Sequence, residues 1–392
     1  MTAVAPALAS ALRPVVGELP VRLRAWDGSE AGAGPVVTVH SKRALRRMLW
    51  SPGELGAAQA YVTGELEVEG DLDDALSHVR SVVSSREVRL RVLPLLGTAL
   101  RLGVVGRRPA PPASQATMTG RLHSRRRDRA AISHHYDLSN AFYAAILDES
   151  MAYSCGYWTG ARTLADAQAS KAGLVCEKLD LRPGDRLLDV GCGWGSLSLY
   201  AASEFGARVT GLTLSAEQKR YVDARDHDGV EVLLRDYRDV TGTFDAVASI
   251  EMGEHVGAAR YPSYVETLRR SVKPGGRVLV QQMSRSGSHP GGGPFIESFI
   301  APDMTMRPVE ETVGLIAAGG LRILDVQPMR EHYVRTVEAW IERFEESLPV
   351  LRTLVPEEVV RVWRLYLVGG RMAFRDGRMG VDQILAERPW TS

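Results

Sequence analysis

A glycine-rich turn is the first segment of this chain whose residue types and spacing could do chemistry. The sequence LLDVGCGWGSLSLYAA is that of an apolar strand, a turn with Gly191, Gly193 and Gly195, and an amphipathic helix. Glycines permit a tight turn and let a ligand approach the backbone, so this order is typical of a nucleotide-binding loop. A dinucleotide fingerprint would carry its third glycine at Ser196, and the spacing therefore disfavours NAD.

Two further residues of chemical interest lie outside this turn. Cys155 stands in the aromatic segment MAYSCGYW, and Glu254 stands in EMGEHVG, which follows a strand-like run. Substrate-facing residues of doubly wound folds collect after such strands, which favours a functional role for Glu254. Spacing alone favours core packing for Cys155, because free cysteine is among the most buried residue types. With Cys176 and Cys192 it forms no CxxC pair, so we expect neither a zinc site nor a disulfide framework, and no metal.

The elements that must position these residues alternate between strand and helix. Apolar pieces run from DRLLDV through RVTGLTL, VEVLLRD and FDAVASI to RVLVQQM, with amphipathic pieces between them. This alternation predicts an α/β fold with a doubly wound, mainly parallel sheet that carries helices on both faces. A Gly, Pro and Ser-rich stretch at about 284–308 interrupts the pattern, and we expect helical insertions there and beyond.

Length and composition bound the domain organisation. With 392 residues, 45% hydrophobic and 24% charged, the chain is typical of a globular protein with two domains. The pattern predicts a small N-terminal α+β domain at 1–108 that contacts a membrane or a partner, a basic linker at 109–129 and a catalytic domain at 130–392. A net charge of +1 excludes a strong overall field, so any attraction to an anionic partner must come from local arginine clusters. No feature indicates a nucleic-acid partner.

The N-terminal run and the arginine clusters bear on localisation. No Lys or Arg precedes Arg13, and Pro6 interrupts the apolar run, so we expect no signal peptide. No uninterrupted apolar run approaches the roughly 20 residues that span a bilayer. We therefore expect a cytoplasmic protein, peripheral at the inner membrane surface; the alternative is that the arginines only solvate surface helices. The clusters are Arg86, Arg89, Arg91, Arg101, Arg107 and Arg108, and Arg121, Arg125, Arg126, Arg127 and Arg129.

Several motifs in order give the chain a family resemblance. From about Ala130 to the C-terminus, HYDLSN, MAYSCGYW, LLDVGCGWG, GLTLSAEQ, RDYRD and EMGEHVG resemble motifs of the cyclopropane-fatty-acyl-phospholipid synthases and their mycolic-acid-modifying relatives. LLDVGCGWG also resembles motif I of the class I S-adenosylmethionine-dependent methyltransferases. The resemblance implies a seven-stranded sheet, S-adenosylmethionine as cofactor, and transfer of a one-carbon unit to the cis double bond of a phospholipid acyl chain at the membrane surface.

The resemblance also implies a set of site residues. Thr213 and Gln218 stand in for the acid that ends the second strand in many such enzymes. Asp236 is placed to accept from the adenine amino group; its alternative is a turn residue that caps a helix. The full set expected to contact the cofactor is Tyr153, Ser154, Gly191, Cys192, Gly193, Thr213, Leu214, Gln218, Asp236 and Tyr237.

In the family, the catalytic base is thought to be a bicarbonate ion held by Cys, Glu, His and Tyr side chains. The corresponding positions here are Cys155, Glu254, Gln281 and Tyr333, so Gln replaces the family His. This replacement keeps hydrogen bonding but removes the option of a positive charge near an anion. A second family cysteine is Gly370, which argues against a covalent cysteine mechanism. We expect His135 to be structural.

Product and function leave alternatives open. After methyl transfer, the carbocation can close a cyclopropane ring as the new methyl loses a proton, or a hydride can shift first and give a 10-methylene chain that calls for a reductase partner. A methyltransferase for a small molecule or lipid head group and an inactive lipid-binding paralogue are the other functions considered. The sequence does not decide the acyl chain, the head group or whether the protein forms a homo-oligomer.

Overall fold

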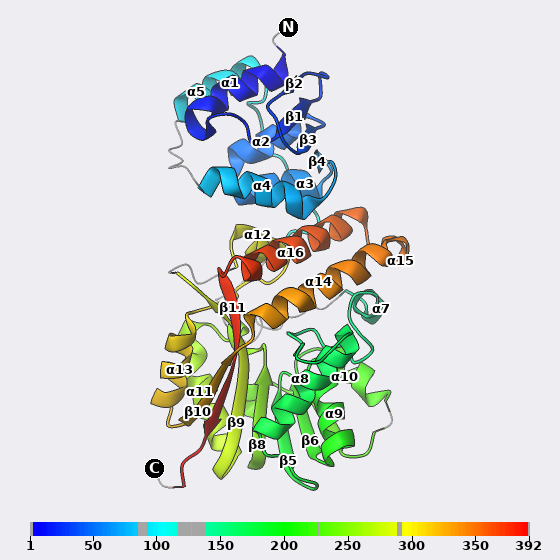
Figure 1. Cartoon of the computed structure of the whole chain (residues 1–392), viewed down its shortest axis with the longest axis vertical. Coiled ribbons are helices and arrows are strands. Elements are labelled where there is room, and N and C mark those ends of the chain that lie inside the picture. Colours follow the sequence, from blue (N-terminus) through cyan, green and yellow to red (C-terminus); the bar gives the residue numbers. More distant parts are fainter. Residues whose placement is uncertain are drawn as a thin grey trace. The chain divides into compact units, whose positions relative to one another are not determined.

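The computed structural model describes residues 3–84, 92–116, 127, 138–225, 227–287 and 292–390. The chain folds as two compact units: unit 1 is residues 1–115 with 355–372, and unit 2 is residues 116–354 with 373–392 (Figure 1). The predicted domain boundaries at residues 108 and 129 stay a prediction. Several predicted features lie outside the described residues: Arg86, Arg89, Arg91, Arg121, Arg125, Arg126, Arg129 and His135.

Unit 1 contains a small sheet covered by helices. Its strands are β1 (Arg22–Ala25), β2 (Glu30–Ala31), β3 (Val36–Val39) and β4 (Leu66–Val68), in the order β2-β1-β3-β4. Strand β1 is parallel to β3, and the other pairs are antiparallel. The helices are α1 (Val4–Val16), α2 (Lys42–Trp50), α3 (Glu54–Val62), α4 (Leu72–Ser84) and α5 (Val92–Arg101). Sheet and helices bury one apolar core, which confirms the predicted α+β architecture of this part.

The C-terminal helix α16 (Glu357–Arg375) returns to unit 1. The guanidinium of Arg361 donates to the carbonyl oxygens of Tyr61 at 2.6 Å and Leu66 at 3.0 Å, and lies 4.4 Å from the centroid of the Tyr61 ring. Arg371 forms an ion pair with Asp73. Residues 355–372, distant in sequence, therefore complete unit 1.

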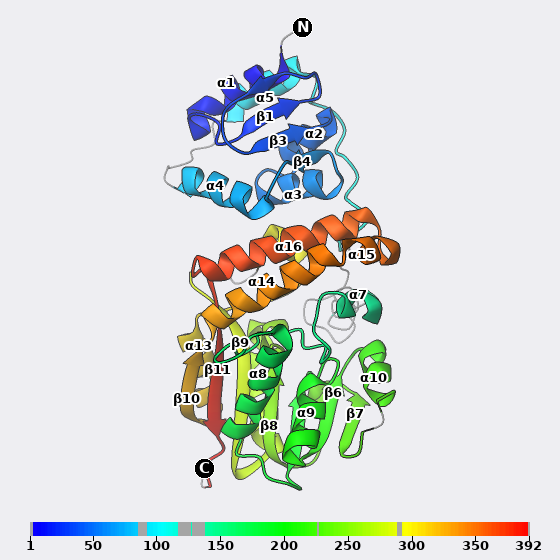
Figure 2. The same cartoon turned by 45° about the vertical axis from the view of Figure 1, so that its right-hand side comes forward.

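Unit 2 is built on a seven-stranded sheet, as predicted. Its order is β10-β11-β9-β8-β5-β6-β7, and only β11 is antiparallel to its neighbours. The strands are β5 (Arg186–Val190), β6 (Arg208–Thr213), β7 (Val230–Leu234), β8 (Phe244–Ile250), β9 (Val272–Arg285), β10 (Arg322–Pro328) and β11 (Met379–Glu387). The helices are α7 (Asn140–Ala144), α8 (Leu164–Lys178), α9 (Ser196–Phe205), α10 (Ala216–Asp223), α11 (Tyr261–Ser271), α12 (Pro294–Phe299), α13 (Val309–Ala318), α14 (Arg330–Glu346) and α15 (Leu348–Leu354) (Figure 1 and Figure 2).

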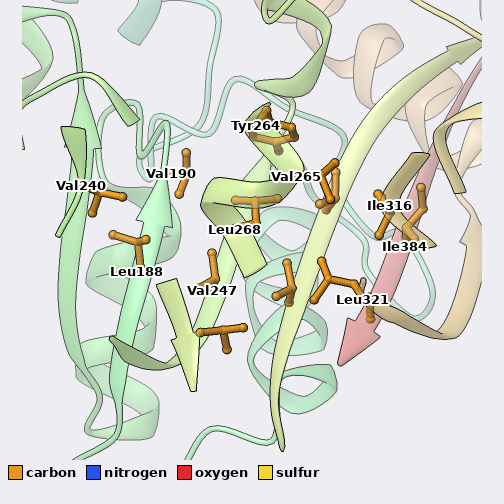
Figure 3. Close-up of a cluster of buried hydrophobic side chains, with 14 of the residues drawn as sticks. Leu188, Val190, Val240, Val247, Tyr264, Val265, Leu268, Ile316, Leu321 and Ile384 are labelled. Atoms are coloured by element: carbon orange, nitrogen blue, oxygen red, sulfur yellow. The ribbon is translucent and has the colours of Figure 1, made fainter. Parts of the chain in front are cut away.

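Helices cover both faces of this sheet. Successive residues of a strand point to opposite faces, so each set of side chains packs against helices. Leu187 packs with Val175 of α8 and Ala201 of α9. The next residue, Leu188, packs in the other cluster with Leu268 of α11 and Ile316 of α13 (Figure 3). The central strands therefore meet apolar helix side chains on both faces of the sheet. This explains why the strands are continuous apolar runs in the sequence.

The chain reverses its direction of progress across the sheet at β5. From β5 it moves outward through β6 and β7, then returns to the other side of β5 with β8 and β9. Ligands of doubly wound folds bind at the carboxyl ends of the strands beside such a reversal. The fold therefore places the candidate site at the ends of β5, β6 and β8. Within the described part of the chain, no helix is both long and apolar enough to cross a membrane.

Candidate active site

The glycine turn links the end of β5 to the start of α9. Gly191, Gly193 and Gly195 have φ values of +86°, +55° and +82°, a region that side chains other than glycine rarely adopt. A Cβ on Gly191 would lie 2.9 Å from Met252 Cγ, and one on Gly195 would lie 2.9 Å from Val222 Cγ2. A Cβ on Gly193 would meet no atom within 4 Å, so the space beside it is open to a ligand.

A pocket of about 1190 Å³, part of it open to solvent, lies at the ends of β5, β6 and β8. All ten residues predicted to contact a cofactor line it: Tyr153, Ser154, Gly191, Cys192, Gly193, Thr213, Leu214, Gln218, Asp236 and Tyr237. Thr213 Oγ1 donates to Gln218 Oε1 at 2.7 Å, and both residues are buried. The carboxylate of Asp236 accepts from the backbone N–H of Arg238 at 3.0 Å and from its guanidinium, so Asp236 both caps the turn and lines the pocket.

One carboxylate at the end of β8 gathers three of the four predicted catalytic residues. Oε1 of Glu251 accepts from the backbone N–H of Cys155 at 2.9 Å and from Nε2 of Gln281 at 2.7 Å. Oε2 accepts from the hydroxyl of Tyr333 at 2.7 Å. Burial raises the pKa of Glu251 above its ordinary value, and these three donors act against that rise. Glu251 also lines the pocket.

The backbone at Glu251 is strained. Its φ is +50°, a conformation that costs a residue with a side chain about 1–2 kcal/mol. The backbone N–H of Glu251 donates to the carbonyl oxygen of Gln281 at 2.7 Å, which holds this conformation against β9. Strained backbone of this kind concentrates at functional sites.

Gln281 is oriented by a second amide. Gln383 faces it directly across the β9–β11 ladder, and Nε2 of Gln383 donates to Oε1 of Gln281 at 3.0 Å. Both side chains are fully buried. Because Oε1 of Gln281 is occupied by this bond, its NH2 group faces the carboxylate of Glu251.

The fourth predicted catalytic residue, Glu254, lies apart from this group. Its Oε1 accepts from the backbone N–H of Met283 at 2.6 Å, and its side chain is fully buried outside the pocket. Burial and the nearby carboxylate of Glu251 raise its pKa to about 8.

The hydrogen-bond partners of the Cys155 thiol are backbone carbonyl oxygens and not Glu251. The thiol donates to the carbonyl oxygen of Gly156 at 3.3 Å, and burial raises its pKa well above the ordinary value. Cys155 therefore joins the group through its backbone N–H, with a neutral thiol.

Sequence reasoning missed Glu251 and Lys171. Lys171 is buried on α8, lines the pocket and donates to Ser154 Oγ at 3.0 Å. Burial lowers its pKa, and the carboxylates of Glu251 and Asp148 oppose this. A capping box formed by Thr163 and Asp166 fixes the residue at which α8 begins, and therefore the position of Lys171 along the helix. Glu251 carried a signal that was available, since it is the first residue after the β8 run FDAVASI.

The chain resembles known proteins along most of its length. Residues 123–384 match the family model described as mycolic acid cyclopropane synthetase. The chain is 38% identical to a probable fatty acid methyltransferase of Pseudomonas putida, over 95% of this chain and 93% of that protein. It is 33% identical to the tuberculostearic acid methyltransferase UfaA1 of Mycobacterium tuberculosis, over 95% of this chain and 88% of that protein. Among solved structures, mycolic acid cyclopropane synthase CmaA1 complexed with SAH and CTAB has a TM-score of 0.63 and 30% identity, and covers 66% of this chain and 98% of its own.

Proposed function

We propose that this chain, which belongs to the mycolic acid cyclopropane synthetase family, methylates a cis double bond in the acyl chain of a membrane phospholipid. The family and its relatives make it an S-adenosylmethionine-dependent methyltransferase that acts on lipid acyl chains. That the methyl group goes to a cis double bond, and that the lipid is a phospholipid, are parts of our proposal. The observation that carries the proposal is the carboxylate of Glu251, held at the wall of the pocket by Cys155, Gln281 and Tyr333.

The pocket residues suit S-adenosylmethionine, which supplies an electrophilic methyl group when bound. The open side of Gly193 lets a ligand meet the backbone of the turn. Thr213 and Gln218, joined by their hydrogen bond, are placed for the ribose hydroxyls at the end of β6. Asp236 is held by Arg238 and is placed to accept from an adenine amino group. These roles follow from the resemblance and from the position of each residue in the pocket wall.

Glu251 is the proposed base. Methyl transfer to the double bond leaves a carbocation on the acyl chain, and a nearby group must take a proton from it. A carboxylate has about four lone-pair directions, and the described donors use three of them, which leaves acceptor capacity toward the pocket. The negative charge also favours the carbocation while it lasts. Tyr333, Gln281 and the Cys155 N–H favour the ionised form of the carboxylate and hold it in place.

A bicarbonate ion does not fit this arrangement. In the family the ion is thought to be held by the side chains that correspond to Cys155, Glu254, Gln281 and Tyr333. Here the side chains of Gln281 and Tyr333 and the backbone N–H of Cys155 already bind the carboxylate of Glu251, and the side chain of Glu254 lies outside the pocket. We therefore assign the role of the predicted bicarbonate base to Glu251, a residue that reaches the pocket.

For the product, we favour the methylene route. Relatives that match nearly the whole chain include probable fatty acid methyltransferases and a tuberculostearic acid methyltransferase, whereas the cyclopropane synthase CmaA1 matches 66% of it. A methylene group becomes a methyl branch by two-electron reduction. Because the glycine turn disfavours a nicotinamide cofactor, a separate reductase would supply those electrons.

The test is expression in a host that makes only monounsaturated phospholipids, with mass spectrometry and proton NMR of the lipids. Vinylidene protons indicate a methylene product, and upfield ring protons indicate a cyclopropane. Methylated head groups would favour the head-group alternative, and unmodified lipid would favour an inactive paralogue.

A matched pair of variants tests the base. Glu251→Gln removes a general base, and such a loss lowers the rate about 10²–10⁴-fold, while affinity for S-adenosylmethionine stays close to that of the wild type. Glu254→Gln is the same change three residues away, and the larger loss of turnover should fall on Glu251→Gln. The reverse order would assign the base to Glu254, and equal losses of turnover and cofactor affinity would indicate a structural role.

A further inference from the structure

One exposed face of unit 1 combines large apolar side chains with cations. Helix α2 and the segment after α5 lie side by side, because Arg46 Nε donates to the carbonyl oxygen of Val104 at 2.9 Å and Trp50 Nε1 to that of Gly106 at 3.0 Å. A Cβ on Gly103 would lie 3.3 Å from Lys42 Nζ, which places that ammonium beside the same segment. The residues gathered here, which we call the basic aromatic face, are Lys42, Arg46, Trp50, Val105, Arg107 and Arg108.

The apolar members of this face are turned to solvent. Trp50 is 52% exposed and Val105 is 48% exposed. A single exposed apolar residue needs no explanation. Here the Trp50 side chain is bonded to the residue next to Val105, so the two exposed groups share one place on the surface. The indole N–H already has its acceptor, which leaves the ring free to enter a less polar medium.

The charge of this face is one-sided. Neither SKRALRRMLWSPG nor GTALRLGVVGRRPAPPASQA contains Asp or Glu. Glu65 pairs with Arg47 at 2.9 Å and with Arg43 at 3.2 Å, two arginines of α2 that are not part of the face. In the described parts of the chain, Lys42, Arg107 and Arg108 have no carboxylate partner, and all three are exposed. The local field is therefore positive although the net charge of the chain is only +1.

We propose that the basic aromatic face docks unit 1 onto the surface of an anionic phospholipid bilayer. An indole ring with its N–H bonded lies readily at the headgroup level of a bilayer, where tryptophan is enriched. Val105 enters beside it, and the cations meet the anionic headgroups. This partner rests on the proposed function, because the acyl chain to be methylated lies in a bilayer, and no described helix spans one.

The experiment is co-sedimentation of the full-length chain with vesicles of saturated phosphatidylglycerol and of saturated phosphatidylcholine. Saturated chains offer no double bond, so binding is measured independently of turnover. We expect binding to phosphatidylglycerol vesicles that weakens as salt rises, and weak binding to phosphatidylcholine. Arg107→Glu/Arg108→Glu should lower vesicle affinity at least tenfold. Val105→Asp, at an exposed position where the fold is not at risk, should lower it as well.

Two control variants match these changes in charge. Arg182→Glu/Arg208→Glu reverses two exposed arginines of unit 2, and Val350→Asp adds a carboxylate at a valine that is 55% exposed. Both should bind vesicles as the wild type does. Equal losses in face and control variants, or binding that ignores lipid charge and salt, would overturn the proposal. The proposal would also be overturned if the wild type sedimented without vesicles and the face variants did not, since the face would then bind a second copy of the chain. Failure of vesicle binding with intact turnover on detergent-dispersed unsaturated lipid would leave the proposed function standing.

Discussion

Removing the hydroxyl of Tyr333 should shift the pH dependence of turnover. The base must be ionised, so turnover falls as pH drops through the pKa of Glu251. Burial raises that pKa above its ordinary value, and the hydrogen bond from Tyr333 opposes the rise because it favours the ionised carboxylate. Tyr333→Phe deletes the bond of 2.7 Å to Oε2 and leaves the ring in place on Phe374. The pKa of Glu251 should therefore rise.

The size of the shift follows from the bond that is lost. A hydrogen bond to a charged group contributes about 1.5–3 kcal/mol, and one pKa unit corresponds to about 1.36 kcal/mol. Tyr333 is only 5% exposed, so water replaces its hydroxyl poorly. The acidic limb should move upward by about 1–2 pH units. At a pH well above both pKa values, the variant should recover most of the wild-type rate.

The assay is kcat against pH with saturating S-adenosylmethionine and dispersed unsaturated phospholipid. Tyr200→Phe is the matched control, because Tyr200 lies on α9 outside the pocket lining and loses the same atom. Its profile should coincide with that of the wild type. An acidic limb that stays in place or moves downward in Tyr333→Phe would refute the assignment of Glu251 as base. A loss of rate that is equal at every pH would show that the hydroxyl of Tyr333 contributes to turnover without changing the pKa of Glu251.

Three further predictions concern the turn, the buried carboxyl and the amide pair. Gly193→Val should abolish binding of S-adenosylmethionine in calorimetric titration, because its side chain would fill the open space beside the turn and its φ of +55° disfavours a branched residue; circular dichroism checks that the variant is folded, and unchanged affinity would remove the turn from the cofactor site. The Glu254 carboxyl has a pKa of about 8 against an ordinary 4.5, so its contribution to stability is present below 4.5 and lost as pH rises through about 8. The melting temperature of Glu254→Gln should therefore exceed that of the wild type increasingly as pH rises through this window, and parallel melting curves would contradict the shift. Gln383→Glu places an acceptor against Oε1 of Gln281, so the Gln281 amide should rotate and turn its oxygen toward Glu251. The pKa of Glu251 should then rise, and the acidic limb of the pH profile of turnover should move upward. Gln383→Leu should move that limb less.

The sheet was predictable because its signals are local. Leu187 and Leu188 are both apolar because helices cover both faces, and the glycines of the turn report positive φ values within one short segment. The return of α16 to unit 1 was not predictable. It depends on Arg361 meeting the carbonyl oxygens of Tyr61 and Leu66, a contact that joins opposite ends of the chain and has no periodic pattern.

The site was predictable to the level of a segment. EMGEHVG was identified as functional, yet its two glutamates lie in different surroundings. A positive φ at Glu251 and the 3-10 helix Gly253–His255 turn the first into the pocket and the second toward the N–H of Met283. The backbone conformation at Glu251 is held by a hydrogen bond to β9. The spacing of residues in the sequence does not report such a contact. The resemblance selected Glu254, and only the hydrogen bonds of Glu251 with Gln281 and Tyr333 point to the other residue.

The carboxylate of Glu251 differs from a bound ion in that it cannot dissociate. A bicarbonate base has to be captured from solution, so its occupancy follows the supply of dissolved carbon dioxide and competes with other small anions. A side chain that directly follows β8 is present in every copy and loses no translational entropy when the substrate arrives. Turnover should therefore be the same in buffers purged of carbon dioxide and in buffers saturated with it. An organism that carries this chain could modify its lipids at a rate uncoupled from inorganic carbon.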